Sequence, residues 1–400
     1  MFVTIVTVLM QAINLYKINR LQTKNRNCYL YLKIKTMKVK DVASILEELA
    51  PLSYAEDFDN TGLLIGDKNA AITGILVTLD TTETVIDEAI SSNCNLIVSF
   101  HPIVFSGLKK ITGATYVERV VAKAIKYDIA IYAIHTALDN AWNGVNAMIC
   151  ETLQLKNKQV LIPQSGTIKK LITYVPVKKV SQVRLALFTA GAGEIGNYTN
   201  CSFTSTGTGS FNANEKSNPT LGEKGELHFE DESKISVTYQ KHLESAIIAA
   251  LHKAHPYEEV AYEITTLENR NQHIGMGMVG ELASAMNETE FLKFLKATMK
   301  TDCIRHSKLN SSTIKKIAVL GGSGSFAIEA AKAAGADAFV TSDLKYHDFF
   351  KAENTIILAD IGHYESEQFT KDLLHSFLSK KITNFAVVLA QTNTNPISYY

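Results

Sequence analysis

Three short apolar runs in this 400-residue chain lead into histidine and carboxylate residues: 96–100 into His101, 130–134 into His135 and Asp139, and 356–359 into His363 and Glu367. A short apolar run is typical of a buried strand, and Pro102 disfavours helix directly after His101. Because open α/β sheets build their sites at the carboxyl ends of strands, we expect these side chains to meet. Imidazole and carboxylate without thiolate suit zinc, iron or manganese, so the pattern predicts a divalent-metal site.

The spacing of His363 and Glu367 adds to this prediction. If a helix starts near Gly362, the two side chains lie on one face about one turn apart and can bind one metal ion or bridge two. The alternative is a solvent-exposed helix start, where acidic groups are favoured by the helix dipole. His135 and Asp139 repeat the spacing, although Asp139 can equally be a turn or cap residue. Two bridged ions would make a hydrolytic centre.

Further polar residues follow other predicted strands. The run GGSGSF at 321–326 can present backbone N–H groups to a phosphate, but it lacks the Walker lysine, and tight-turn glycine is the alternative. Thr341, Asp343 and His347 can line the same cleft as the predicted metal ligands, or Asp343 can cap the next helix. The acidic loop 55–62 is either a solvated turn or a second cleft-facing segment.

The order of elements predicts the fold class. Strands and helices alternate over 39–136 and again from 315 to 360, which indicates parallel pairing with right-handed crossovers. Between them, paired strands and two helices suggest a ferredoxin-like module. We therefore expect an α/β protein: a two-lobed α/β domain with mostly parallel sheets, interrupted by an inserted α+β module. The expected ranges are 1–36 for an N-terminal extension outside the fold, 37–160 for the first lobe, 167–270 for the insert and 275–400 for the second lobe.

Composition excludes several classes of protein. Lys plus Arg and Asp plus Glu number 40 each, so no net charge draws the chain to duplex nucleic acid or an anionic membrane. Five dispersed cysteines without CxxC spacing argue against a disulfide framework and a structural zinc knuckle, and they favour a reducing, cytoplasmic setting.

The basic segment before Met37 contains no Asp or Glu. It is too short and too polar for a spanning helix, and it lacks the features of a secretory or transit signal. We expect an extension from an upstream start, with Met37 opening the domain. The alternative is a targeting or membrane-surface role.

A series of motifs gives the chain a family resemblance from about Met37 to its end. They are AEDFDNTGLLIG, FHP, IHTALDNAWNGVN, GGSGSF, ADAFVTSDLKYHDF and ADIGHYESE, in that order. Together they resemble the GTP cyclohydrolase I type 2 homologue family, also called the NIF-three-like dinuclear metal-centre proteins. YVP, GAGEIGNYTNCSF and AHPYEEVAYE resemble the inserted module of its longer bacterial members, which is related in fold to the CutA and P-II proteins.

The resemblance implies a paired-metal site between two lobes, one or two divalent ions per subunit, and a ring-shaped homo-oligomer, a hexamer. The family's metal ligands fall on His101, Asp139, His363 and Glu367. Most members have two adjacent histidines before the proline, whereas this chain has Phe100 at the first position. Whether both metal positions fill is therefore open, and His135 lies near enough in sequence to compensate.

The family name implies opening of the imidazole ring of GTP by a metal-activated water that attacks C8. Glu365 and His135 are candidate proton shuttles, and the sequence shows no triphosphate clamp. Two functions stay open. One is a metal-dependent hydrolase acting on a nucleotide or another phosphorylated small molecule. The other is a non-enzymatic metal-binding regulator or metal carrier, with the inserted module as a sensor or a cover for the ring's opening.

Overall fold

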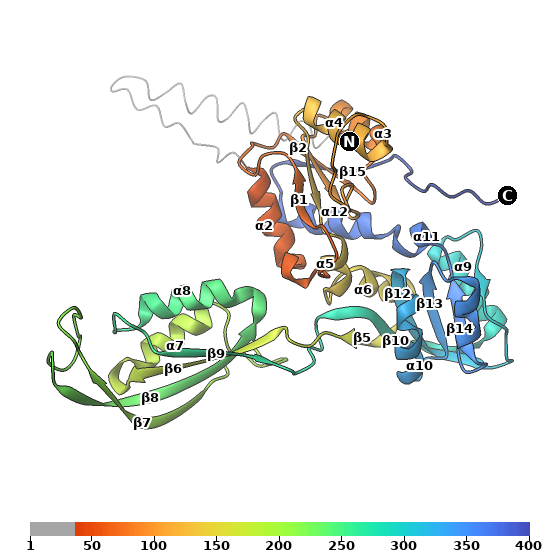
Figure 1. Cartoon of the computed structure of the whole chain (residues 1–400). Helices are drawn as coiled ribbons and strands as arrows, with labels where there is room; N and C mark the ends of the chain where they lie inside the picture. The colour runs from red at the N-terminus through yellow and green to blue at the C-terminus, as the bar shows by residue number, and fades with distance from the viewer. Residues whose placement is uncertain (1–36) are drawn as a thin grey trace, which may run out of the picture. The chain divides into compact units, whose positions relative to one another are not determined.

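The computed structural model describes residues 37–400 of the chain, and every structural statement below concerns these residues (Figure 1). The predicted extension 1–36 lies outside the described residues. No helix within 37–400 is long and apolar enough to cross a membrane.

The first sheet carries the strands that lead to His101 and His135. Its five strands have three parallel pairs, and β1 is antiparallel at one edge. In spatial order they are β1 (Gly62–Ile65), β4 (Ala130–Ala133), β3 (Leu96–Ser99), β2 (Gly74–Thr78) and β15 (Ala386–Leu389). β2, β3 and β4 are buried along their whole length, as parallel strands covered on both faces must be.

Helices cover both faces of this sheet. On one face lie α2 (Val39–Leu49) and α12 (Thr370–Lys381), and on the other α3 (Glu83–Ser91) and α4 (Tyr116–Lys126). Thr82 caps the start of α3, because its hydroxyl accepts a hydrogen bond from the Val85 N–H. The alternation of strand and helix predicted for this region is confirmed.

The second sheet is mixed. In spatial order it contains β11 (Arg305–His306), β14 (Ile357–Asp360), β13 (Ala338–Ser342), β12 (Thr313–Ser323), β10 (Gly275–Asn287) and β5 (Lys156–Pro163). Only β12–β13 and β13–β14 are parallel; the other three pairs are antiparallel. The expectation of mostly parallel strands is wrong here, because the chain leaves for the insert along β5 and returns beside it along β10.

Helices also flank this second sheet. α6 (Val145–Thr152) and α9 (Glu288–Met299) pack on one face, and α10 (Ile328–Ala333) packs on the other after the 3-10 turn η4 (Ser325–Ala327). The cluster that contains α6 and α9 also contains residues of β2, β3 and α12, so one continuous apolar core joins the two sheets. This core holds the carboxyl ends of both sets of parallel strands in place.

Two strands pair across the expected lobe boundaries. β5 follows the first-lobe helices but pairs with β10 of the second sheet, and β15 follows the second-lobe helices but pairs with β2 of the first. The ranges 37–160 and 275–400 stay predictions as domain boundaries, yet neither range contains a complete sheet.

The third sheet lies in the insert. Its elements follow one another as β6 (Ile168–Pro176), α7 (Val180–Thr189), β7 (Phe203–Asn212), β8 (Leu227–Gln240), α8 (Glu244–Ala254) and β9 (Tyr262–Leu267). All pairs are antiparallel in the order β7-β8-β6-β9, which is the βαββαβ arrangement of ferredoxin-like modules. Both helices pack on one face, in a core separate from the one that joins the first two sheets.

Candidate metal centre

His101 reaches the centre from the first sheet. It follows β3, and its N–H donates to the carbonyl of Leu79 at 2.9 Å, which fixes the backbone at the strand end. Its ring Nδ1 lies 2.7 Å from Asp80 Oδ1. Because β2 and β3 are parallel, Asp80 after one strand and His101 after the next arrive at the same edge of the sheet.

His363 reaches the centre from the other side. It opens the short helix α11 (His363–Glu367), after Gly362 in a backbone conformation with φ of 92°. Its Nδ1 lies 2.6 Å from Asp343 Oδ2, and the Ser323 hydroxyl donates to the same oxygen. Asp343 follows β13, so it belongs to the second sheet.

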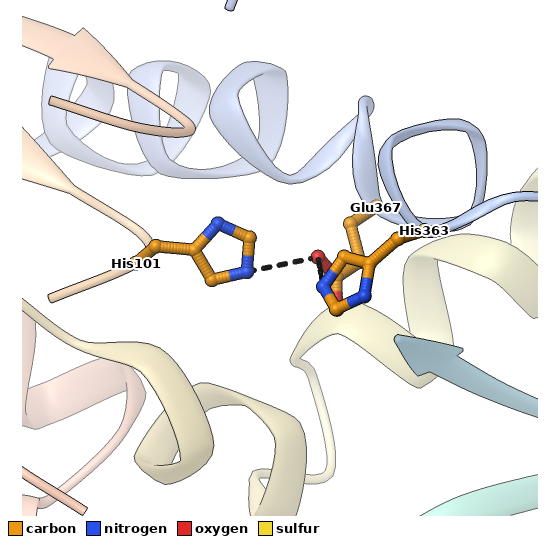
Figure 2. Close-up of side chains that lie close together, drawn as sticks. All are labelled: His101, His363 and Glu367. Carbon is orange, nitrogen blue, oxygen red and sulfur yellow. Dashed lines mark ion pairs between the residues drawn. The ribbon is translucent and has the colours of Figure 1, made fainter. Parts of the chain in front are cut away.

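Glu367 lies between these two rings (Figure 2). Its Oε2 is 3.1 Å from His101 Nε2 and 3.2 Å from His363 Nε2. Neither contact has hydrogen-bond geometry, and this buried oxygen has no hydrogen-bond partner among the described residues. One ligand atom from each of the three residues lies within 4.8 Å of the other two, so the three could hold a metal ion.

The glycines at the end of β12 make room for Glu367. A Cβ on Gly322 would lie 2.5 Å from Glu367 Oε1, and its φ of 69° already disfavours other residues. The Gly322 N–H donates to Ser366 Oγ at 2.9 Å. The run GGSGSF therefore holds α11 close to the sheet, which agrees with the tight-turn interpretation.

The charges at the centre are strongly coupled. Burial alone would lower the pKa of His101, but the Glu367 carboxylate and the Asp80 hydrogen bond raise it to about 10. Burial would also lower the pKa of His363, but the hydrogen bond to Asp343 and the Glu367 carboxylate outweigh it and raise this pKa to about 11. Burial would raise the pKa of Glu367, but the two imidazolium charges lower it to about 2. Without a metal ion, protons on the two rings balance the carboxylate.

Asp139 lies beside this set but is not one of its three mutually close members. It is buried in α5 (His135–Asn140), and its Oδ1 has no hydrogen-bond partner among the described residues. Burial, followed by the charge on Glu367, raises its pKa well above the ordinary value. The Asn146 side chain connects the Asp139 carbonyl to the Gly321 N–H, at 3.0 and 3.1 Å. A second buried carboxylate oxygen without a hydrogen-bond partner among the described residues suits a bound cation.

His135 and Phe100 complete the surroundings. The His135 ring centroid is 5.3 Å from that of His101, and its Nδ1 lies 2.8 Å from Asp59 Oδ1. Phe100 is fully buried and packs against both rings, with centroids 4.8 Å from His101 and 5.6 Å from His135. Its side chain offers no donor atom to a metal ion.

These residues fit a divalent metal ion. Two imidazoles, each anchored through Nδ1 to a carboxylate, direct Nε2 towards a carboxylate oxygen that lacks a hydrogen bond. The donor atoms are nitrogen and oxygen without sulfur, as zinc, iron and manganese accept.

Comparison with known proteins identifies the family. The model of the family described as Duf34/NIF3 (NGG1p interacting factor 3) matches residues 37–396. The chain belongs to the Duf34/NIF3 family. A Bacillus subtilis relative named GTP cyclohydrolase 1 type 2 homolog is 39% identical over 374 residues, which cover 91% of this chain and 99% of that protein. The resemblance read from the sequence is thus confirmed.

Solved structures of Duf34/NIF3 proteins share the fold. A Bacillus cereus protein related to NIF3 superposes with a TM-score of 0.80 at 36% identity, covering 92% of this chain and 100% of that one. A Staphylococcus aureus protein does so with a TM-score of 0.73 at 30% identity, covering 91% and 99%.

Of the other site residues that the sequence suggested for this Duf34/NIF3 protein, some lie at the centre and one does not. Asp343 and the loop residue Asp59 face the histidines, in agreement with the cleft interpretation. His347 instead packs against Tyr346 and Phe350. No role for Asp80 was predicted from the sequence, although a carboxylate just after a buried strand was a usable signal.

Proposed function

We propose that this Duf34/NIF3 protein holds one or two divalent metal ions (zinc, iron or manganese) and hydrolyses a nucleotide or another phosphorylated small molecule. The proposed ligands are His101, Asp139, His363 and Glu367. One observation carries the proposal: two Nδ1-anchored imidazoles and a buried carboxylate oxygen without a hydrogen bond converge at the edges of two sheets.

The chain's own residues prepare the site for this reaction. Asp80 and Asp343 can only accept hydrogen bonds when ionised, so they keep a proton on Nδ1 of each ring and leave Nε2 free as a ligand. A divalent ion bound there would acidify a water molecule to near neutral pH. His135, oriented by Asp59, lies close enough to the centre to take up a proton at Nε2.

A second function rests on the charge around the site. Apart from the two histidines themselves, the side chains paired or hydrogen-bonded to His101, His363, Asp343 and Asp80 are acidic or uncharged, and none of these contacts within the described residues involves lysine or arginine. A triphosphate would find no cationic clamp there. This favours a non-enzymatic metal-binding regulator or metal carrier as the alternative.

Turnover by metal-loaded protein separates the two functions. We would incubate the protein with GTP and other nucleotides in turn, and assay formate, ring-opened product and released phosphate. The hydrolase proposal expects turnover that is lost in Glu367→Gln and kept in Glu48→Gln, whose carboxylate pairs with Lys381 on the surface. Turnover that persists in Glu367→Gln would remove this site from the reaction. Tight, reversible metal uptake without turnover would favour the carrier.

The resemblance also supports proposals about assembly and setting. We propose a cytoplasmic homohexamer in which the insert, residues 167–270, is a CutA/P-II-like module that covers the opening of the ring. Light scattering should give six times the chain mass of 44.0 kDa. A monomer or dimer at micromolar concentration would contradict the ring.

A further inference from the structure

The segment that follows β15, residues 391–400, reaches the metal centre. β15 pairs in parallel with β2, with Leu389 opposite Val77, and the Ala390 N–H donates to the Val77 carbonyl at 2.9 Å. Because both strands run in the same direction, the residues after β15 emerge beside the residues after β2. Asp80, which orients the His101 ring, lies at that point.

Thr394 contacts this aspartate directly. Its hydroxyl donates to Asp80 Oδ2 at 2.7 Å, while Asp80 Oδ1 lies 2.7 Å from Nδ1 of His101. Within residues 37–400, Thr394 is the only hydrogen-bond partner of that second oxygen. Since the Asp80 side chain is 33% exposed, packing alone does not fix its rotamer. One carboxylate thus connects a hydroxyl of the C-terminal segment to an imidazole of the centre.

The next residue, Asn395, reaches the other half of the centre. Its side-chain N–H donates to Glu365 Oε1 at 3.1 Å. Glu365 is 5% exposed and lies on α11 between His363 and Glu367, and its Oε2 has no hydrogen-bond partner among the described residues. Two neighbouring residues of one segment therefore contact Asp80, which orients His101, and Glu365, which lies on the helix that carries His363 and Glu367.

We propose that Thr394 is a positioning residue of the metal centre: it holds Asp80 in the rotamer that aims His101 Nε2 at the metal ion. Asn395 assists by holding α11 through Glu365. This inference rests on the proposed metal site, but it assigns part of the affinity of that site to a segment that supplies no ligand. Replacing outer partners of metal-bound histidines costs about 10–100-fold in metal affinity. Because Thr394 acts through Asp80, we expect about 10-fold, the lower end of that range.

The test compares two threonines of the same segment. Thr392 also donates its hydroxyl to a carboxylate, Glu88 Oε2, at 2.5 Å, but within residues 37–400 Glu88 forms no hydrogen bond or ion pair with a histidine. We would measure Co²⁺ affinity by chelator competition, the visible spectrum of bound Co²⁺, and thermal unfolding of the metal-free protein. Thr394→Val should bind Co²⁺ about 10-fold more weakly, with an altered spectrum. Thr394→Ser should restore both, and Thr392→Val should match the unchanged protein.

The outcomes are distinguishable. Unchanged affinity and spectrum in Thr394→Val would overturn the positioning role and leave the metal site standing. Failure of the unchanged protein to bind Co²⁺ would overturn both the role and the proposed function. If Thr394→Val unfolds at a lower temperature than Thr392→Val, the pair Thr394→Ser and Thr394→Ala decides, because it differs only by the hydroxyl. Equal Co²⁺ affinities in that pair would also overturn the role.

Discussion

At the residue scale, the three histidines near the centre share one arrangement. In each, Nδ1 lies within hydrogen-bonding distance of an aspartate: Asp80 for His101, Asp343 for His363 and Asp59 for His135. A carboxylate in this place fixes the ring and favours the tautomer with a free Nε2 lone pair. In a set of ion pairs both Nε2 atoms would carry protons and donate hydrogen bonds to Glu367 Oε2, yet this oxygen has no hydrogen-bond partner among the described residues. The repetition therefore favours a metal site over a set of structural ion pairs.

Replacing one of these aspartates tests the arrangement. In Asp343→Asn the side chain keeps its shape but loses the charge that orients His363. We expect metal affinity to fall about 10–100-fold, as measured by competition with a chromophoric chelator. Asp348→Asn is the matched control, because Asp348 pairs with Lys351, 2.7 Å away, and with no histidine of the part of the chain that the structure describes. Equal affinities for the two variants would contradict the role of Asp343.

The raised pKa values of the histidines predict how metal binding depends on pH. In the metal-free protein the pKa is about 10 for His101 and about 11 for His363, so both rings are protonated at neutral pH. A metal ion needs Nε2 without its proton, so binding releases protons. The affinity therefore rises with pH until the pH passes the pKa values of the two rings, where they are deprotonated without metal. Calorimetry in buffers of different ionisation enthalpy should show release of about one to two protons per site. A binding enthalpy independent of the buffer would rule this out.

The side chains of the centre could be predicted from the sequence to different degrees. His101, His363 and Glu367 were found because each follows a short apolar run, which marks a strand end. Asp80 was missed although it directly follows a buried strand, and Thr394 was missed because its role depends on strands β2 and β15 pairing across more than 300 residues. Local patterns carry no information on such pairing.

At the scale of elements, the turn from β12 into η4 decides how closely α11 approaches the sheet. Gly322→Ala would place a Cβ 2.5 Å from Glu367 Oε1 and strain a backbone with φ of 69°. We expect metal affinity to fall and the free energy of unfolding to drop by about 1–3 kcal/mol, measured by chelator competition and denaturant unfolding.

Gly335→Ala separates these two effects. Gly335 has the same φ of 69°, but a Cβ there would meet no atom within 4 Å. It should lose similar stability from backbone strain and keep full metal affinity. Loss of metal affinity in both variants, or in neither, would show that the glycine does not act through Glu367.

Elements were easier to predict than their arrangement. Strands such as β3 and β4 lie where the short apolar runs 96–100 and 130–134 placed them. The antiparallel pairs of the second sheet were not foreseen, because direction follows from where the chain returns after the insert. The alternation of strand and helix specifies parallel pairing only where no long segment intervenes.

At the scale of the whole molecule, sheets and core tie distant parts of the sequence together. β15 closes the first sheet from the far end of the chain, and the core that joins the two sheets includes α2, α6, α9 and α12. The metal centre lies where the two sheets meet, so its geometry depends on this shared core. The insert, with its own core, takes no part in that packing.

Removing the insert tests this division. Ile168 and Leu267 face each other in an antiparallel pair, about 5 Å apart, so a short glycine linker can replace residues 168–267. Besides its own core, the variant loses the hydrogen bond from Tyr54 to Gln240, worth about 1 kcal/mol, the edge-to-face contact of Tyr54 with His242, and the hydrogen bond from the Lys241 N–H to the Thr167 carbonyl. We expect it to fold cooperatively and to keep the Co²⁺ affinity and spectrum of the full chain, since every proposed ligand and its partners remain. A folded variant that no longer binds Co²⁺ would show that the insert belongs to the metal centre.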